Sequence, residues 1–335
     1  MNEDHKKVEH DQNKAQRQKK DYTLPISILV SSVIFAGAWI YTSGLKYEQG
    51  GAQVKSQTKA QTAASKFEEK IIPSAGVVLP VKWGNLGMRM VENGVIDFQK
   101  LNEVYAGRGG MGTAMKALLQ KSDNGSLVIT RQNSGEILNL LWAFGLANKN
   151  TILENGPMQD PRYGGAGRFA STGGWTISAG SPMDHYSAHQ FVTLTAEQQV
   201  LVEKVAKNIY RPCCGNSVYF PDCNHGMAML GLLELMAAQG ATEEQMYKTA
   251  LSVNSYWFPD TYLTIARYMQ NNGIDWDSIS AKTILGATYS SAQGYQRIQS
   301  LVAPEPSSNQ SQGGCGVDAG QPVVQPQKQQ SGCGV

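Results

Sequence analysis

The stretch that decides the fold spans residues 224–239 and reads Asn224-His225-Gly226-Met227-Ala228-Met229-Leu230-Gly231-Leu232-Leu233-Glu234-Leu235-Met236-Ala237-Ala238-Gln239. Its apolar residues fall on every face of a helix rather than in one stripe, which predicts a helix buried at the centre of the domain. Asn224 or Asp222 is the expected N-cap, and Gly240 marks the C-terminal stop.

Glu234 is the only Asp, Glu, Lys or Arg in this stretch. A carboxyl group inside an apolar helix needs a partner, or it keeps its proton because burial raises its pKa. Arg211 and Lys204 are the candidate partners.

Helical periodicity and capping signals recur along the chain. The capping-box pattern occurs at Thr195–Gln198 and at Thr242–Gln245, and Ser134 is expected to cap another helix. Strand signals are confined to residues 126–130 and 191–194. The expected helices, besides the one that follows Thr242, cover residues 97–106, 111–120, 134–148, 195–209, 224–239, 259–271 and 278–302. The sequence therefore predicts one mainly α-helical domain over residues 76–302.

Glycine and proline dominate residues 155–182, which predicts a long irregular loop. Loops of this length in compact domains tend to be functional or mobile. His185 and His189 follow it and are four residues apart. If residues 181–188 are helical, both imidazole rings lie on one face and can serve as metal ligands.

Residues 24–45 contain no charged side chain and at helical rise span about 33 Å, enough to cross the hydrocarbon core of a bilayer. Lysine and arginine crowd the preceding residues, 1–23, which are expected to be a disordered tail. The positive-inside rule predicts a single-pass protein of the plasma (inner) membrane, with a cytoplasmic N-terminus and an extracytoplasmic domain. A cleaved signal peptide is the alternative, because Ala36-Gly37-Ala38 fits a cleavage site.

Two further segments flank the domain. Residues 46–75 are rich in Gln, Lys, Thr and Ala and are expected to form a stalk. Residues 303–335 are rich in Pro, Gln, Ser and Gly and are expected to be disordered. This tail repeats Gly-Cys-Gly-Val around Cys315 and Cys333, which makes these two cysteines candidate auxiliary thiols.

Composition excludes several function classes. A net charge of +2 argues against nucleic acid as the main partner. The sequence has no P-loop, no G-x-G-x-x-G, no H-E-x-x-H, no C-x-x-C-H and no G-x-S-x-G motif. No nucleophile is marked either, so no catalytic residue is assigned and a non-enzymatic role is favoured. The protein partner, if the chain has one, is not indicated by the sequence.

Three of the five cysteines lie in the segment that precedes and begins the central helix. Cys213, Cys214, Cys223 and His225 can supply thiolates and an imidazole, and His185 and His189 are further candidates. Cysteine with histidine suits Zn(II), and cysteine with methionine suits Cu(I). The leading hypothesis is therefore a membrane-anchored protein that binds or handles zinc or copper, with Cys315 and Cys333 as auxiliary ligands.

Two other interpretations of the same cysteines stay open. Outside the cytoplasm thiols tend to oxidise, so Cys223 can pair with Cys213 or Cys214 and hold the loop on the helix in a structural or binding protein. Such a disulfide would add about 2–3 kcal/mol of stability. In the other interpretation these cysteines carry out thiol–disulfide exchange, because a thiolate at a helix N-terminus is stabilised by the helix dipole.

Pro212-Cys213-Cys214-Gly215 followed by Asp222-Cys223 resembles the pattern of bacterial extracytoplasmic proteins named for a P-C-Y-C-G-C motif. Those proteins have a helical, cysteine-rich segment and are thought of as metal-related, so the resemblance implies a metal site here. The likeness is confined to this short segment, which lacks the alternating cysteines of the motif.

Overall fold

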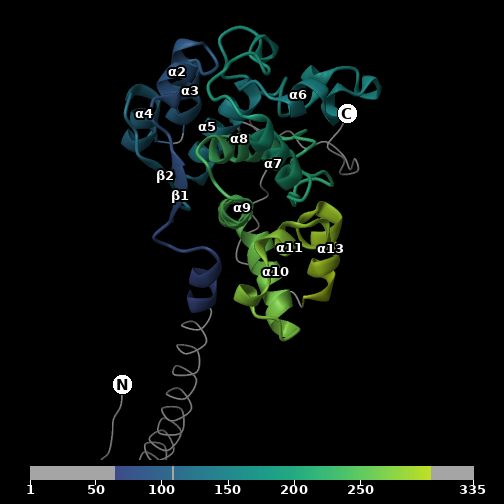
Figure 1. The fold of residues 1–335 in the computed structure, drawn as a ribbon. Helices are drawn as coiled ribbons and strands as arrows, with labels where there is room; N and C mark the ends of the chain where they lie inside the picture. Colours follow the sequence, from purple (N-terminus) through teal and green to yellow (C-terminus); the bar gives the residue numbers. More distant parts are fainter. Residues whose placement is uncertain (1–64, 108, 303–335) are drawn as a thin grey trace, which may run out of the picture. The chain divides into compact units, whose positions relative to one another are not determined.

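The computed structural model describes residues 65–107 and 109–302 (Figure 1). The predicted membrane span, the N-terminal tail, residues 46–64 of the expected stalk and the C-terminal tail with Cys315 and Cys333 lie outside these residues. In the described part of the expected stalk, Ile71 and Ile72 are buried in the core, so the domain begins before the predicted residue 76. Within the described residues, no helix combines the length and the apolar character needed to cross a bilayer. The described chain from Lys66 onward forms one compact unit.

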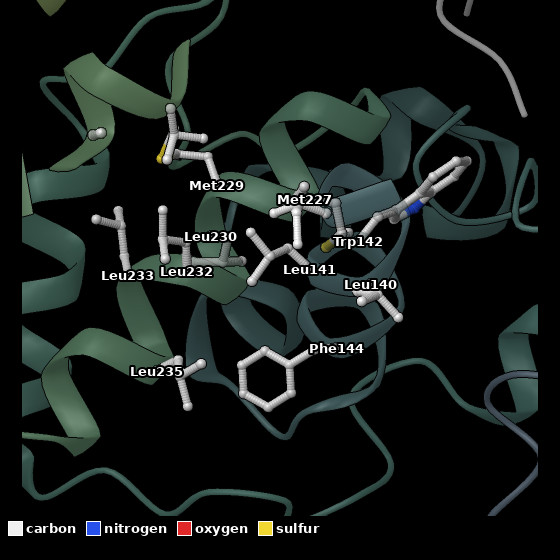
Figure 2. Packing of buried hydrophobic residues seen from close by; sticks show 14 of the residues in the cluster. Leu140, Leu141, Trp142, Phe144, Met227, Met229, Leu230, Leu232, Leu233 and Leu235 are labelled. Carbon is white, nitrogen blue, oxygen red and sulfur yellow. The ribbon is translucent and has the colours of Figure 1, made fainter. Parts of the chain in front are cut away.

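Two helices form the centre of this unit, α5 (Ser134–Ala147) and α8 (Asn224–Ala238). All residues of α8 from Asn224 to Ala237 are buried, which confirms the prediction of a helix covered on every face. Side chains from both helices interlock in the core shown in Figure 2, including Leu140, Leu141, Trp142, Phe144, Met227, Leu230 and Leu235.

Glycines let α5 and α8 approach until their backbones touch. A Cβ added to Gly145 would lie 2.2 Å from the Met227 carbonyl oxygen, and one added to Gly231 would lie 2.6 Å from that of Leu141. Both distances are far below van der Waals contact, so only glycine fits at this crossing. The position of α8, and of the residues at its N-terminus, follows from this contact.

A two-stranded antiparallel sheet covers part of the N-terminal half. It pairs β1 (Val77–Lys82) with β2 (Ser126–Ile129), with Val78 opposite Val128. β2 confirms the strand expected at 126–130. β1 was not expected, because Pro80 interrupts its apolar run and proline lacks the amide hydrogen that a ladder uses. Between the two strands the chain forms three helices, α2 (Leu86–Glu92), α3 (Phe98–Ala106) and α4 (Thr113–Gln120).

The strand expected at residues 191–194 does not form. The backbone amides of Phe191 and Val192 donate to the side-chain oxygen Oδ1 of Asn148 instead, at 3.1 and 3.0 Å. The Asn148 side chain therefore accepts the hydrogen bonds that the backbone carbonyls of a neighbouring strand would otherwise accept. Residue 189 does reach the end of α5, through a parallel bridge between Asn148 and His189.

The long segment after α6 (Thr151–Asn155) is irregular, as the glycines and prolines predict. It contains short 3₁₀ turns and no α-helix between residues 156 and 195. Its turns begin at prolines or glycine-rich pairs, and they are η1 (Pro157–Gln159), η2 (Pro161–Tyr163), η3 (Ala166–Arg168) and η4 (Pro182–Asp184). The helix over residues 181–188 that would place His185 and His189 on one face does not form, and the segment contains only the single turn η4.

Capping boxes start α7 (Ala196–Ala206) and α9 (Glu243–Trp257), as predicted from Thr195 and Thr242. α10 (Pro259–Asn271) has its predicted bounds. The cap of α5 was predicted wrongly, because Asn133 rather than Ser134 occupies that position. Asn133 Oδ1 accepts a hydrogen bond from the Thr130 amide instead and so closes the turn after β2.

One long helix was expected over residues 278–302, and the structure breaks it into three. After the turn η5 (Trp276–Ser278) come α11 (Ala281–Leu285), α12 (Ala287–Ser290) and α13 (Ala292–Leu301). Gly286 separates the first two, and the Ser291 side chain caps α13 by accepting from the Gly294 amide. Gly294 packs on α12, where an added Cβ would lie 2.3 Å from the Ala287 carbonyl oxygen.

Candidate metal centre

The cysteine segment is a tight loop between α7 and α8. An antiparallel bridge joins Tyr210 to Ser217, and the Val218 amide donates to the Ile209 carbonyl oxygen at 2.8 Å. These contacts bend the chain so that Cys213 and Cys214 face back toward the start of α8. Cys223 is the N-cap residue of α8, where neither predicted cap, Asn224 or Asp222, is found.

The loop brings three of the predicted ligands together. One donor atom each of Cys213, Cys223 and His225 lies within 4.8 Å of the other two. The Sγ atoms of Cys213 and Cys223 are 3.5 Å apart, whereas a disulfide bond measures about 2.05 Å. None of the three cysteines in the described chain is disulfide-bonded. A second, overlapping set comprises Cys214, Asp222 and Cys223.

Cys223 is buried, and its pKa differs strongly from that of an ordinary thiol. Hydrogen bonds from Cys213 and Cys214 hold its pKa well below the ordinary value, with help from the charge of Arg211 and a hydrogen bond from His225. Burial opposes this shift without overcoming it. Cys223 is therefore the thiolate of the cluster.

Cys214 behaves in the opposite way. The hydrogen bond with Cys213 lowers its pKa, but the hydrogen bond to Cys223 and burial outweigh that effect and raise the pKa to about 12. Cys214 therefore keeps its proton and donates it toward the Cys223 sulfur. The two neighbouring sulfurs thus share one negative charge.

Arg211 supplies the positive charge of the site, and its side chain is fully buried. Its Nη2 donates to Asp222 Oδ1 at 2.5 Å, to Cys214 Sγ at 3.0 Å and to the Phe220 carbonyl oxygen at 3.3 Å. Burial alone would lower the pKa of Arg211. The surrounding sulfurs and Asp222 raise it by more than burial lowers it, so the net shift is upward and the guanidinium stays charged. Its Nε and Nη1 have no hydrogen-bond partner among the described residues.

Asp222 completes the ion pair. Burial raises its pKa, and Arg211 and the amide of Asn216 oppose that shift. Asn216 Nδ2 donates to Asp222 Oδ2 at 2.7 Å, so both carboxylate oxygens are bonded. The backbone carbonyl of Asp222 accepts from the Ser171 amide at 3.2 Å, which attaches the long glycine-rich loop to the cysteine segment.

Two aromatic rings position His225 on the first turn of α8. Its ring lies 4.4 Å from that of Phe258 and 5.7 Å from that of Trp257, measured between centroids. These residues end α9 and precede α10, so the C-terminal helices form one wall of the centre. His225 is 8% exposed, which leaves its imidazole largely shielded from water.

The other two predicted histidines form a separate pair. His185 Nδ1 lies 3.1 Å from His189 Nε2, and the rings are stacked. His185 Nε2 lies 2.9 Å from the Ala179 carbonyl oxygen, so it donates, and in the neutral pair His189 Nε2 donates to His185 Nδ1. Neither histidine belongs to the sets of clustered ligand atoms around Cys223. A positive φ of 51° at Ser187, rather than a helix, brings the rings together.

The sequence did not indicate that Arg211 and Asp222 belong to this site. Arg211 was considered as a partner for Glu234, but the partner of Glu234 is Asn148, whose Nδ2 donates to Glu234 Oε2 at 2.6 Å. The available signal was local, since Arg211 and Asp222 flank the cysteines directly. A charged residue at each end of a loop that is otherwise nearly apolar indicates an ion pair across it.

Comparisons with protein-family models, with curated proteins and with solved structures found no match to this chain.

Proposed function

We propose that this protein binds a soft or borderline metal ion, Zn(II) or Cu(I), through Cys213, Cys223 and His225. The observation that carries the proposal is the convergence of two sulfurs and an imidazole nitrogen within 4.8 Å. Two thiolates on a tetrahedral zinc ion with bonds of about 2.3 Å are separated by about 3.8 Å. The 3.5 Å between the Cys213 and Cys223 sulfurs is close to that separation.

The electrostatics of the loop support the same proposal. Metal binding requires deprotonated ligands, and the low pKa of Cys223 reduces the cost of removing its proton. Two thiolates balance the charge of Zn(II), and the Arg211–Asp222 pair adds no net charge. With Cu(I), the same two thiolates leave one negative charge, which Arg211 lies close enough to stabilise.

Three protein ligands leave a coordination position open. An open position suits a protein that passes its ion to another molecule or accepts an exchangeable ligand. Cys214 lies beside the set. We propose that this thiol and those of the tail residues Cys315 and Cys333 are the incoming ligands. The proposed activity is therefore metal binding and handling rather than storage in a closed site.

The test is the metal content of the full-length chain, purified without a histidine tag and measured by elemental mass spectrometry with a parallel thiol count. We expect near-stoichiometric zinc or copper, lost in Cys223→Ser and strongly reduced in Cys213→Ser and His225→Gln. His189→Gln serves as the matched control, because it removes an imidazole outside the cluster. Absence of metal from the wild-type chain, even after incubation with each ion, would rule out the proposal.

Thiol–disulfide exchange is a second candidate, favoured by the contact between a partly exposed and a buried cysteine. Cys213 would pass its proton to the neighbouring Cys223 thiolate, and its sulfur would attack a disulfide of a partner protein and release one partner thiolate. Cys223 would then give that proton to the released thiolate, attack the Cys213 sulfur of the mixed disulfide and release the second partner sulfur as a thiolate. The products are a Cys213–Cys223 disulfide and a partner dithiol, so two electrons pass to the partner.

Equilibration in glutathione buffers separates this candidate from a purely structural disulfide. In glutathione buffers with potentials above about −300 mV, an exchange protein is expected to interconvert between the dithiol and a Cys213–Cys223 disulfide. A structural disulfide stays oxidised in the same buffers. The measurement is the ratio of linked to unlinked peptides by mass spectrometry after acid quenching. A bridge that no buffer reduces would favour the structural role.

We also propose that the centre lies outside the cytoplasm. The uncharged residues 24–45 follow a lysine- and arginine-rich segment, and such segments stay on the cytoplasmic side of a membrane span. Val200→Cys offers a reporter, since this side chain is 66% exposed. We expect a membrane-impermeant maleimide to label the variant, above the parent chain, in intact cells. Labelling that needs permeabilised cells would place the domain in the cytoplasm.

A further inference from the structure

A cavity of about 650 Å³ lies apart from the cysteine cluster, and the metal proposal does not account for it. Its walls come from α6 and the two residues before it, the segment before α7, the first turns of α7, and Tyr219 of the cysteine loop. This volume lies within the range of small-molecule sites, about 300–1,000 Å³.

Uncharged hydrogen-bonding groups dominate the walls. Asn155, Gln190 and Gln199 contribute amides, and Thr151 and Thr193 contribute hydroxyl groups. An amide presents a donor and an acceptor side by side, and a hydroxyl group acts as either. Such a surface matches a ligand whose own groups also donate and accept, as sugar hydroxyls do.

The charged groups at the cavity come in neutralised pairs. Glu154 lies 3.7 Å from Lys149, and Glu203 lies 3.7 Å from Lys207. The lining has one lysine and two glutamates, and each glutamate has a lysine within 4 Å, Lys207 lying outside the lining, so the walls offer no cationic cluster for a phosphate and no unpaired carboxylate for a polycation. The ligand that fits is uncharged.

The cavity also has apolar surface, from Val192, Leu194 and Tyr219. The Nζ atom of Lys207 lies 4.4 Å from the centroid of the Tyr219 ring, which holds that ring in place. A sugar ring carries C–H groups on its faces and hydroxyl groups on its rim. It can therefore contact the apolar side chains and the amides at the same time.

One wall is held rigidly by the central helix. Asn148 accepts from the amides of Phe191 and Val192, and it donates to the fully buried Glu234 of α8. Further along, Gln198 Nε2 donates to the Ala237 carbonyl oxygen at 2.8 Å. The segment between these two attachments forms the wall, so the cavity is preformed and its ligand does not have to order it.

We infer that this cavity binds a neutral oligosaccharide. The amide and hydroxyl groups bind the sugar hydroxyls, and Val192, Leu194 and Tyr219 contact the C–H faces. Binding does not depend on the cysteine cluster, so it persists in Cys223→Ser and in the presence of a metal chelator.

The test is isothermal titration of the full-length chain in lauryldimethylamine oxide, a detergent without a sugar headgroup. The probes are cellotetraose, which offers only hydroxyl groups, and chitotetraose, which adds acetamido groups. Tetraglycine with an acetylated N-terminus and an amidated C-terminus, an uncharged peptide without hydroxyl groups, is the comparison ligand. We expect saturable binding of at least one tetrasaccharide and none of tetraglycine.

Two exposed positions provide matched variants. Thr193→Trp fills the cavity and is expected to weaken tetrasaccharide binding by about tenfold or more. Val200→Trp adds the same side chain on α7, outside the lining residues, and should leave the Kd unchanged. Failure of both tetrasaccharides to bind, binding of tetraglycine alone, or an unchanged Kd in Thr193→Trp would overturn the inference.

Discussion

The guanidinium of Arg211 lies directly against the backbone of Gly226, where an added Cβ would come within 2.7 Å of Arg211 Cζ. Gly226 is in the first turn of α8, between His225 and the buried core. The absence of a side chain at this position therefore provides the space in which the only fully buried arginine of the described chain meets the three cysteines.

Gly226→Ala tests this relationship. We expect a loss of about 1–3 kcal/mol in unfolding free energy, typical of overpacking, because Arg211 is fixed by three hydrogen bonds and cannot move freely. Urea unfolding provides the measurement. Gly135→Ala is the control, since nothing lies within 4 Å of its added Cβ in α5, and it should be neutral or slightly stabilising. Equal effects of the two changes would contradict the assigned contact.

The buried ion pair predicts strong coupling between Arg211 and Asp222. Each single change, Arg211→Met or Asp222→Asn, leaves the other group without its partner and should cost about 3–5 kcal/mol. The double variant should lose less than the sum, with a coupling energy of about 1–3 kcal/mol. A double-mutant cycle by urea unfolding measures this, and additive losses would mean that the pair does not interact in solution.

Glu234 predicts a pH dependence that its amide variant lacks. Burial raises its pKa well above 4.5, and hydrogen bonds from Asn148 and Asn150 only partly oppose this. The folded chain thus binds a proton that the unfolded chain releases above about pH 4.5. Stability should fall by about 1.4 kcal/mol per pH unit above that value, until the pKa of the folded state is reached.

Glu234→Gln keeps an acceptor for Asn148 and cannot ionise. The difference in unfolding free energy between this variant and the wild-type chain, measured from pH 4 to pH 8, should grow with pH in favour of the variant. Glu103→Gln, on the exposed surface of α3, supplies the baseline. Parallel pH profiles for Glu234→Gln and the wild-type chain would show that Glu234 is ionised in the folded state.

The histidine pair predicts the opposite sign. Burial, and then the charge of His185, lower the pKa of His189 below 6.5. The unfolded chain therefore binds more protons than the folded chain as the pH falls below 6.5, and stability should decrease across that interval. Nuclear magnetic resonance titration, with the His189 signal assigned from His189→Gln, should give a midpoint below 6.5. A midpoint at or above 6.5 would show that burial and the neighbouring ring do not disfavour the charged form of His189.

Local patterns predicted much of the helical fold. The apolar run of α8, the two capping boxes and the proline that begins α10 are signals within a few residues, and each placed its helix correctly. The errors arose where distant contacts decide. The segment at 191–194 uses the Asn148 side chain instead of a strand partner, and tight packing of Gly294 on α12 accompanies the break of a helix expected to be continuous.

The sequence predicted the types of ligand at the site, but it did not predict every residue that belongs to the site. Cysteine and histidine gathered in one short segment pointed to Cys213, Cys223 and His225, which the loop does bring together. The burial of Arg211 was not predictable, because no local sequence signal distinguishes a buried arginine from an exposed one. His185 and His189 were expected to share a face only if residues 181–188 were helical, and a left-handed residue rather than a helix brings their rings together.

The contact of α5 with α8 through Gly145 and Gly231 constrains how this sequence can evolve. A methyl group at either position would push the two helices apart, and no change at the other position can create the missing space, because that residue is already glycine. Compensation would require displacement of α8 itself, and with it of Cys223 and His225 at its start. The surface and the loops can therefore change during evolution. Replacement of Gly145 or Gly231 is excluded as long as selection maintains the cysteine cluster.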